Sequence, residues 1–192
     1  MSLVRLQNYQ LPEELARAPV LGPVMPPIAS YFKVLQSSLT PPNGVQRSFV
    51  VPETFESGKL LVYVSELKLS PNSPVAEYTE DPETSTVQVL ESLTPEALDT
   101  VRFTFLKFGV YNSLWRFNAL PTAPPDGSTT TFYTKTRPFF DRLNTGGLRP
   151  YLWAWVCGVL VKIVGFVPPQ SFTLPFAPNP DEVLELLYLE AC

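Results

Sequence analysis

The side chains that could support chemistry are few in this sequence, and their spacing fits no catalytic arrangement. The 192 residues include no histidine, which removes Ser-His-Asp catalysis, Cys-His catalysis and the commonest metal ligand together. The nine glycines never take the spacing of a phosphate-binding loop. Cys157 has apolar neighbours on its strand, where a thiol is expected to be buried and unreactive. We therefore expect no enzymatic activity and no cofactor.

One cluster of carboxylates is the candidate for a cation site. Glu77, Glu80, Asp81 and Glu83 lie close together near the tip of an expected hairpin, and carboxylate oxygens are the ligands that Ca²⁺ prefers. Their spacing matches no calcium-binding loop, and a solvated acidic turn is the commoner use of such a cluster. We predict no bound metal.

Aromatic side chains form the other group with chemical potential. Tyr151, Trp153 and Trp155 are two residues apart, which places all three on one face of a strand. Such a row fits the core of a sandwich, an anchor in a subunit interface, or a stacking platform for a host glycan. Trp115 lies between two repeated segments and is expected to hold them together. The interface candidates are Tyr151, Trp153, Trp155 and Trp115, with Pro23, Pro26 and Pro27.

The elements that position these residues occur twice along the chain. The first segment of each copy places a glycine turn before a strand, as Asn43-Gly44 before Ser48–Val51 and Asp126-Gly127 before Thr131–Thr134. Further matches follow in the same order: Leu61–Ser65 with Trp153–Cys157, Thr86–Val89 with Ser171–Leu174, and Val101–Phe103 with Leu186–Tyr188. A repeat of this kind indicates two stacked structural modules.

The expected fold is all-β, with two tandem small antiparallel β-sandwich modules and a Pro-rich extended N-terminal arm. The 22 prolines lie between short alternating runs, which favours strands with many turns over helices. We place the arm at 1–42, module one at 43–108, a linker at 109–125 and module two at 126–192. Lys59–Leu69 and Tyr151–Val161 are each expected to form one strand. The arm, with Pro23, Pro26 and Pro27, is expected to dock on a neighbouring subunit or another protein.

Charge and composition limit the partners. The net charge of −4 argues against nucleic-acid binding. Ten acids and two bases lie between residues 53 and 99, whereas seven bases and two acids lie between 102 and 149. These segments are either solvated faces or complementary patches that set the register between chains. Modules of this size bury a limited fraction of their surface, so a homo-oligomer is expected. The apolar stretch 151–167 is short and contains Lys162, so no membrane association is expected.

The two copies carry a resemblance. The run Phe117-Asn118-Ala119-Leu120-Pro121-Thr122, continued by Asp126-Gly127 and by Thr131-Phe132, resembles the opening of a β-sandwich module that recurs in structural proteins of tailed-bacteriophage virions. The remainder of the module is similar to Leu60–Val64, Glu77–Asp81, Thr86–Val89 and Asp99–Phe103. The module occurs in tail-fibre, neck, baseplate and decoration proteins, and the likeness covers about residues 43–190. The resemblance implies a structural role and no catalytic residues.

These observations predict a non-enzymatic component of a tailed-phage virion that oligomerises and docks on other virion proteins. It would be assembled in the host cytoplasm and belong to the tail, the neck or the capsid exterior. A receptor- or glycan-binding module is the first alternative, with the aromatic row or the loop Lys135–Pro150 as its contact. The coat protein of a small non-tailed virus is the second, although such proteins often carry a basic arm and residues 1–42 hold three bases against two acids.

Overall fold

A computed structural model of the chain describes residues 32–107, 114–138, 140–142 and 148–190. Over these residues the protein contains no α-helix, and all its strand pairs are antiparallel. The expectation of an all-β fold is confirmed. Most of the expected arm, including Pro23, Pro26 and Pro27, lies outside the described residues.

Module one spans residues 32–107 and consists of two sheets. Its inner sheet has the order β1-β7-β3-β4, and its outer sheet has the order β2-β6-β5. A single 3-10 turn, Glu91–Leu93, follows β6. The strands are β1 Phe32–Ser37, β2 Ser48–Val50, β3 Phe55–Val64, β4 Leu67–Lys68, β5 Tyr78–Asp81, β6 Thr86–Val89 and β7 Val101–Lys107.

Module two spans residues 114–190 and repeats this arrangement. Its inner sheet has the order β8-β16-β12-β13, and its outer sheet has the order β9-β15-β14. The long loop between β9 and β12 contains an additional two-stranded ribbon, β10-β11. The strands are β8 Trp115–Ala119, β9 Thr131–Tyr133, β10 Phe140–Arg142, β11 Leu148–Pro150, β12 Leu152–Val156, β13 Val159–Val161, β14 Gly165–Val167, β15 Ser171–Thr173 and β16 Leu184–Leu189.

The repeat in the sequence corresponds to a repeat in topology that extends to local backbone details. The first strand of each inner sheet carries a bulge at a residue with positive φ, Leu35 at 44° and Asn118 at 45°. The Asn43-Gly44 and Asp126-Gly127 turns also match, since each glycine has positive φ and donates its N–H to a proline carbonyl. Glycine adopts this left-handed conformation without steric cost, which explains its presence in both copies.

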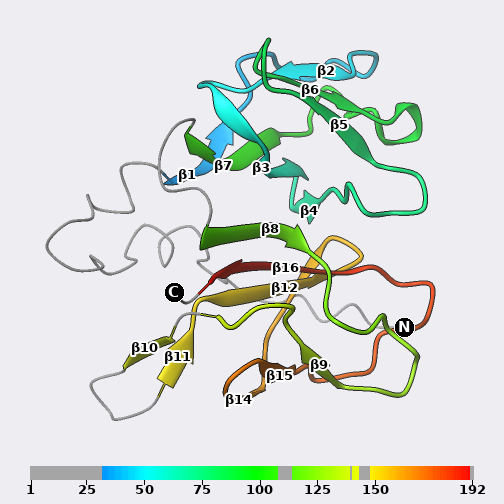
Figure 1. The fold of residues 1–192 in the computed structure, drawn as a ribbon. Helices are drawn as coiled ribbons and strands as arrows, with labels where there is room; N and C mark the ends of the chain where they lie inside the picture. The colour runs from blue at the N-terminus through cyan, green and yellow to red at the C-terminus, as the bar shows by residue number, and fades with distance from the viewer. Residues whose placement is uncertain (1–31, 108–113, 139, 143–147, 191–192) are drawn as a thin grey trace, which may run out of the picture.

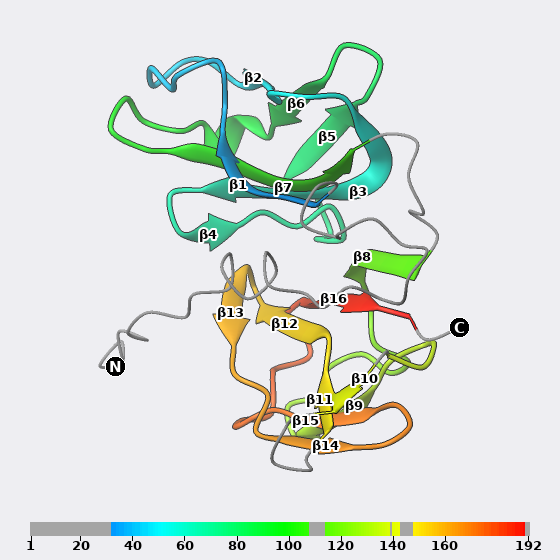
Figure 2. The ribbon, with the colours of Figure 1, turned by 90° about the vertical axis from the view of Figure 1, so that its left-hand side faces the viewer.

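The two modules stack as four layers (Figures 1 and 2). The outer sheet of module one is followed by its inner sheet, then by the inner sheet of module two and last by the outer sheet of module two. One apolar core lies inside each sandwich, and a third lies between the two inner sheets. We call the contact between the inner sheets the junction.

Two strands lie outside the boundaries suggested by the repeated motifs. β1, at 32–37, falls in the segment interpreted as the arm and pairs with β7, and β8, at 115–119, falls in the expected linker and pairs with β16. Each precedes the glycine turn from which the repeat was recognised. The bulges at Leu35 and Asn118 interrupt the alternation in these strands, which removes the period-two signal of a strand.

Two expected single strands are hairpins. The run Lys59–Leu69 turns at Ser65-Glu66 between β3 and β4, and Tyr151–Val161 turns at Cys157-Gly158 between β12 and β13. Pairing of Tyr63 with Lys68 brings Lys68, and not Leu67, to the junction face, because the turn reverses the chain. Cys157 is exposed in its turn, so the expectation that it fills the core is wrong.

Candidate functional site

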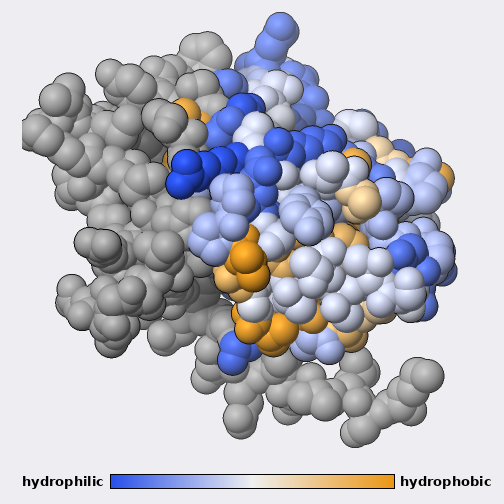
Figure 3. Space-filling view, turned by 60° about the horizontal axis from the view of Figure 1, so that its bottom comes forward, coloured by the Kyte–Doolittle hydropathy of each residue, from blue (hydrophilic) through white to orange (hydrophobic). Residues whose placement is uncertain are grey.

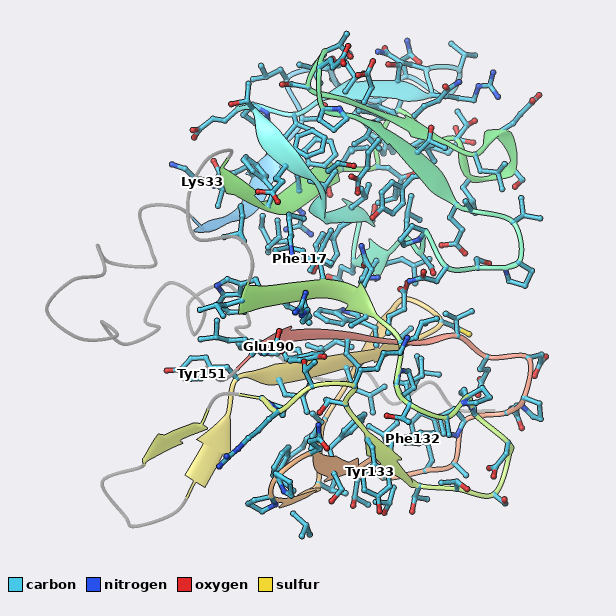
Figure 4. All side chains as sticks on the ribbon, in the orientation of Figure 1. Lys33, Phe117, Phe132, Tyr133, Tyr151 and Glu190 are labelled. Carbon is cyan, nitrogen blue, oxygen red and sulfur yellow. The ribbon has the colours of Figure 1, made fainter. Side chains whose placement is uncertain are left out.

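The aromatic residues singled out in the sequence gather at the junction. Trp115 on β8 and Trp155 on β12 are 4% and 2% exposed, and both pack in a cluster with Leu61 and Tyr63 of module one. Figure 4 shows Phe117, also of β8, between the ribbons of the two modules. Trp115 therefore belongs to an apolar cluster to which both modules contribute.

Tyr151 and Trp153 complete the predicted row and lie on the same face. Both are half-buried and pack against the junction core. The ring of Trp153 stacks on Trp115 at 6.4 Å between centroids, and Tyr151 meets Trp153 edge-on at 6.3 Å. The expected i, i+2, i+4 row is present, but Trp155 is covered by module one. A platform of three exposed rings for a glycan is not available in this arrangement.

A buried ion pair crosses the junction. Lys68 of β4 and Glu185 of β16 form a salt bridge in which both side chains are almost completely buried. The carboxylate of Glu185 also accepts hydrogen bonds from Ser70 Oγ at 2.8 Å and Asn72 Nδ2 at 2.6 Å. Module one thus supplies three donors to one carboxylate of module two.

The surroundings of Lys68 show how this charge is accommodated. Its Nζ lies 5.7 Å from the centroid of the Trp155 ring, a distance at which the ring face attracts a cation. Burial lowers the pKa of Lys68, and the nearby Glu185 carboxylate opposes that change. A buried pair contributes little net stability compared with apolar residues, but it strongly disfavours arrangements that separate the two charges. We interpret the pair as fixing how the modules face one another.

Hydrogen bonds to backbone carbonyls complete the junction. Lys59 Nζ donates to the carbonyl of Trp115 at 2.6 Å, and Asn118 Nδ2 donates to the carbonyl of Leu60 at 3.0 Å. The N–H of Lys68 donates to the carbonyl of Gly158 at 3.0 Å. A Cβ at Gly158 would lie 2.1 Å from the Lys68 carbonyl oxygen, so this close approach requires glycine.

Three carboxylates of the acidic cluster accept hydrogen bonds from neighbouring segments of module one. Glu77 Oε2 accepts from the Ser70 N–H at 2.6 Å, and Glu80 Oε2 accepts from the Gly58 N–H at 2.8 Å. Asp81 accepts from the Thr84 hydroxyl at 2.7 Å. Burial raises the pKa of Glu80, and the bond from Gly58 opposes the rise. The part of the chain that the structure describes contains no group of three or more side chains placed to hold a metal.

The outer sheets have the same register but different surfaces. In module one, Val50, Thr86 and Asp81 lie side by side across the three strands. The equivalent row of module two is Tyr133, Ser171 and Val167, in which Tyr133 is 54% and Val167 is 65% exposed. In Figure 4, Phe132 lies on the interior side of β9 and Tyr133 on the outer side. Val167 therefore occupies a surface position that carries a carboxylate, Asp81, in module one, whereas Tyr133 stands where module one has the smaller apolar Val50.

Sequence reasoning missed Lys68, Gly158 and Glu185. The sequence did not place Lys68 at the junction, because the run Lys59–Leu69 was expected to form one strand and not to turn at Ser65-Glu66. Glu185 did carry a signal, since it is the one charged residue inside the apolar strand 184–189. A lone carboxylate in such a run indicates a buried partner, although the sequence does not indicate which residue that is.

No protein family, curated protein or solved structure was found that matches this chain. Among the described residues, none of the elements is a helix with the length and hydropathy that a membrane span requires.

Proposed function

We propose that this protein is a non-enzymatic structural component of a tailed-phage virion that oligomerises and docks on other virion proteins. The proposal assigns it to the tail, the neck or the capsid exterior and to assembly in the host cytoplasm. The resemblance of both sequence copies to a virion sandwich module supports this assignment.

The observation that carries the proposal is the junction. Two copies of one sandwich are joined by a continuous apolar layer that contains Trp115, Trp155 and Leu187, with the Lys68–Glu185 pair inside it. A layer of this kind holds the two modules together as one unit, so they do not move independently on a linker. A rigid block with two sheet faces at its ends is suited to filling a fixed position between other proteins.

The use of the reactive side chains favours the same function. The carboxylates of Glu77, Glu80 and Asp81 accept hydrogen bonds from backbone N–H groups, and the Glu185 carboxylate accepts hydrogen bonds across the junction. Polar groups that are engaged in this way support loops and module packing.

The test is quantitative mass spectrometry of particles purified from a culture that produces the protein. The expected result is a fixed copy number per particle that survives repeated gradient purification. Absence of the chain from purified particles would refute the proposal. Light scattering of the full chain and of a chain lacking 1–31 then tests self-association. The deletion must end before residue 32, because β1 belongs to the inner sheet of module one.

A further inference from the structure

The outer sheet of module two presents an exposed apolar surface that the fold does not require. Tyr133, Val164 and Val167 are 54%, 56% and 65% exposed. Figure 3, which brings this end of the molecule forward, shows apolar side chains gathered among pale polar ones. We call this surface face D; it consists of the outward side chains of β9, β14 and β15 with Val164.

Module one shows that the sandwich folds with a carboxylate at one of these positions. Asp81 stands where module two has Val167, and Val50 stands where it has Tyr133. We call the outward side chains of β2, β5 and β6 face B; they include exposed Ser48, Thr79, Gln88 and Asp81. Because the equivalent sheet of module one carries a carboxylate at the Val167 position, folding does not require an exposed apolar residue there.

The charges around the two faces are opposite. Residues 128–135 and 162–174 contain the exposed Lys135 and Lys162 and no acid. The equivalent segments of module one, 45–52 and 77–89, contain four acids and one base, Arg47, which is paired with the nearby Glu91 at 3.2 Å. Asp81 and Glu83 remain exposed at one end of face B. At the β2 edge of that face, Leu39 is 66% exposed and donates its N–H to the Val50 carbonyl, which adds an apolar surface.

From this complementarity we propose that face D of one molecule binds face B of a second copy of this chain. The two faces lie at opposite ends of the four-layer stack, so one molecule cannot join its own faces (Figure 1). A contact between unlike faces is heterologous, and it builds a ring when the rotation closes and a filament when it does not. This inference rests on the proposed function, since it names the self-contact through which such a component would assemble.

Two sets of substitutions in the full chain test the proposal by sedimentation velocity over a range of protein concentrations. Val167→Asp blocks face D with the residue that module one carries at the equivalent position, so it is compatible with the fold. Glu83→Lys with Gln88→Lys blocks face B. Each variant is expected to weaken self-association by at least about tenfold, because an unpaired charge is desolvated in the contact. Leu98→Asp, at a 98% exposed residue outside both faces, is the control and leaves association unchanged.

Mixing the two blocked variants gives the decisive measurement. The Val167→Asp protein keeps face B and the Glu83→Lys/Gln88→Lys protein keeps face D, so an equimolar mixture is expected to form heterodimers and nothing larger. A second face D variant, Lys135→Glu with Lys162→Glu, is expected to associate with the face B variant through reversed charges. Circular dichroism establishes that each variant is folded.

Several results would overturn the proposal. These are a wild-type chain that stays monomeric, a mixture that stays monomeric, or association that persists in the face B variant alone, which would indicate face D binding itself. Loss of association on removal of 1–31 would identify the N-terminal segment as the occupant of face D. A monomeric chain that is nevertheless present in purified particles refutes this inference, together with oligomerisation, and leaves standing the proposed role of docking on other virion proteins. A self-associating chain that is absent from particles does the reverse.

Discussion

The buried Lys68–Glu185 pair gives the sharpest test of how the modules are held together. We expect Lys68→Met and Glu185→Leu, made singly, to destabilise the protein strongly, because each leaves a buried charge without its counterion. The double substitution replaces both charges with apolar side chains of similar length. It is expected to restore most of the lost stability.

The structure assigns different magnitudes to the two single changes. After Lys68→Met, the Glu185 carboxylate keeps its bonds from Ser70 at 2.8 Å and Asn72 at 2.6 Å. The expected loss is about 3 kcal/mol, at the lower end of the range for a broken buried pair. After Glu185→Leu, Lys68 Nζ keeps only the Leu69 carbonyl at 3.3 Å among the bonds described. The expected loss is then about 5 kcal/mol. The double variant should lie within about 2 kcal/mol of the wild type.

The assay is urea-induced unfolding at pH 7, followed by circular dichroism and tryptophan fluorescence, with the four proteins forming a double-mutant cycle. Lys33→Met is the matched control, because the Lys33–Glu53 pair at 3.1 Å is about one third exposed. Its loss should cost less than about 1 kcal/mol. Coincident transitions by both probes would show that the modules unfold together.

Two outcomes would refute the reasoning. A loss of less than about 1 kcal/mol for both single variants would mean that water reaches the pair and that the junction is not closed. A double variant that loses the sum of the single effects would mean that the two residues act independently.

Three further predictions concern single positions. Gly158→Ala should lower the free energy of unfolding by about 3 kcal/mol, because the new Cβ meets the Lys68 carbonyl. Gly58→Ala should lower it by only about 1 kcal/mol, because Gly58 also has positive φ but has open space around it. Equal losses in thermal unfolding would contradict this prediction. Trp115→Ala should destabilise by about 3–5 kcal/mol in urea unfolding, and a loss below about 1 kcal/mol would show that the ring does not join the modules. Bonds from Thr129 and Ser128 lower the pKa of Asp126, so its contribution to stability is present above the unfolded pKa and is lost as the pH falls through the folded one. Asp126→Asn should remove the loss of stability that protonation of this carboxyl causes at low pH. Parallel pH–stability curves for the two proteins would contradict the prediction.

The sequence by itself determined the fold class, the duplication and the face on which the aromatic row lies. Alternation along a strand is a local property, and the Asn43-Gly44 and Asp126-Gly127 turns are set by residues next to one another. These features can therefore be predicted without knowledge of distant contacts. The same local signals failed at the bulges of β1 and β8 and at the turn that sends Lys68 to the junction.

Only the tertiary structure decided what covers each apolar face. The pattern around Trp153 and Trp155 indicates that a face is buried, but it is the same whether the cover is a second subunit, a ligand or the other half of the chain. Stacking of the inner sheets made the other module that cover, and it brought together Lys68 and Glu185, which are 117 positions apart. Burial depends on which surfaces meet, and that is fixed by the summed packing of both modules, which no local run of residues encodes.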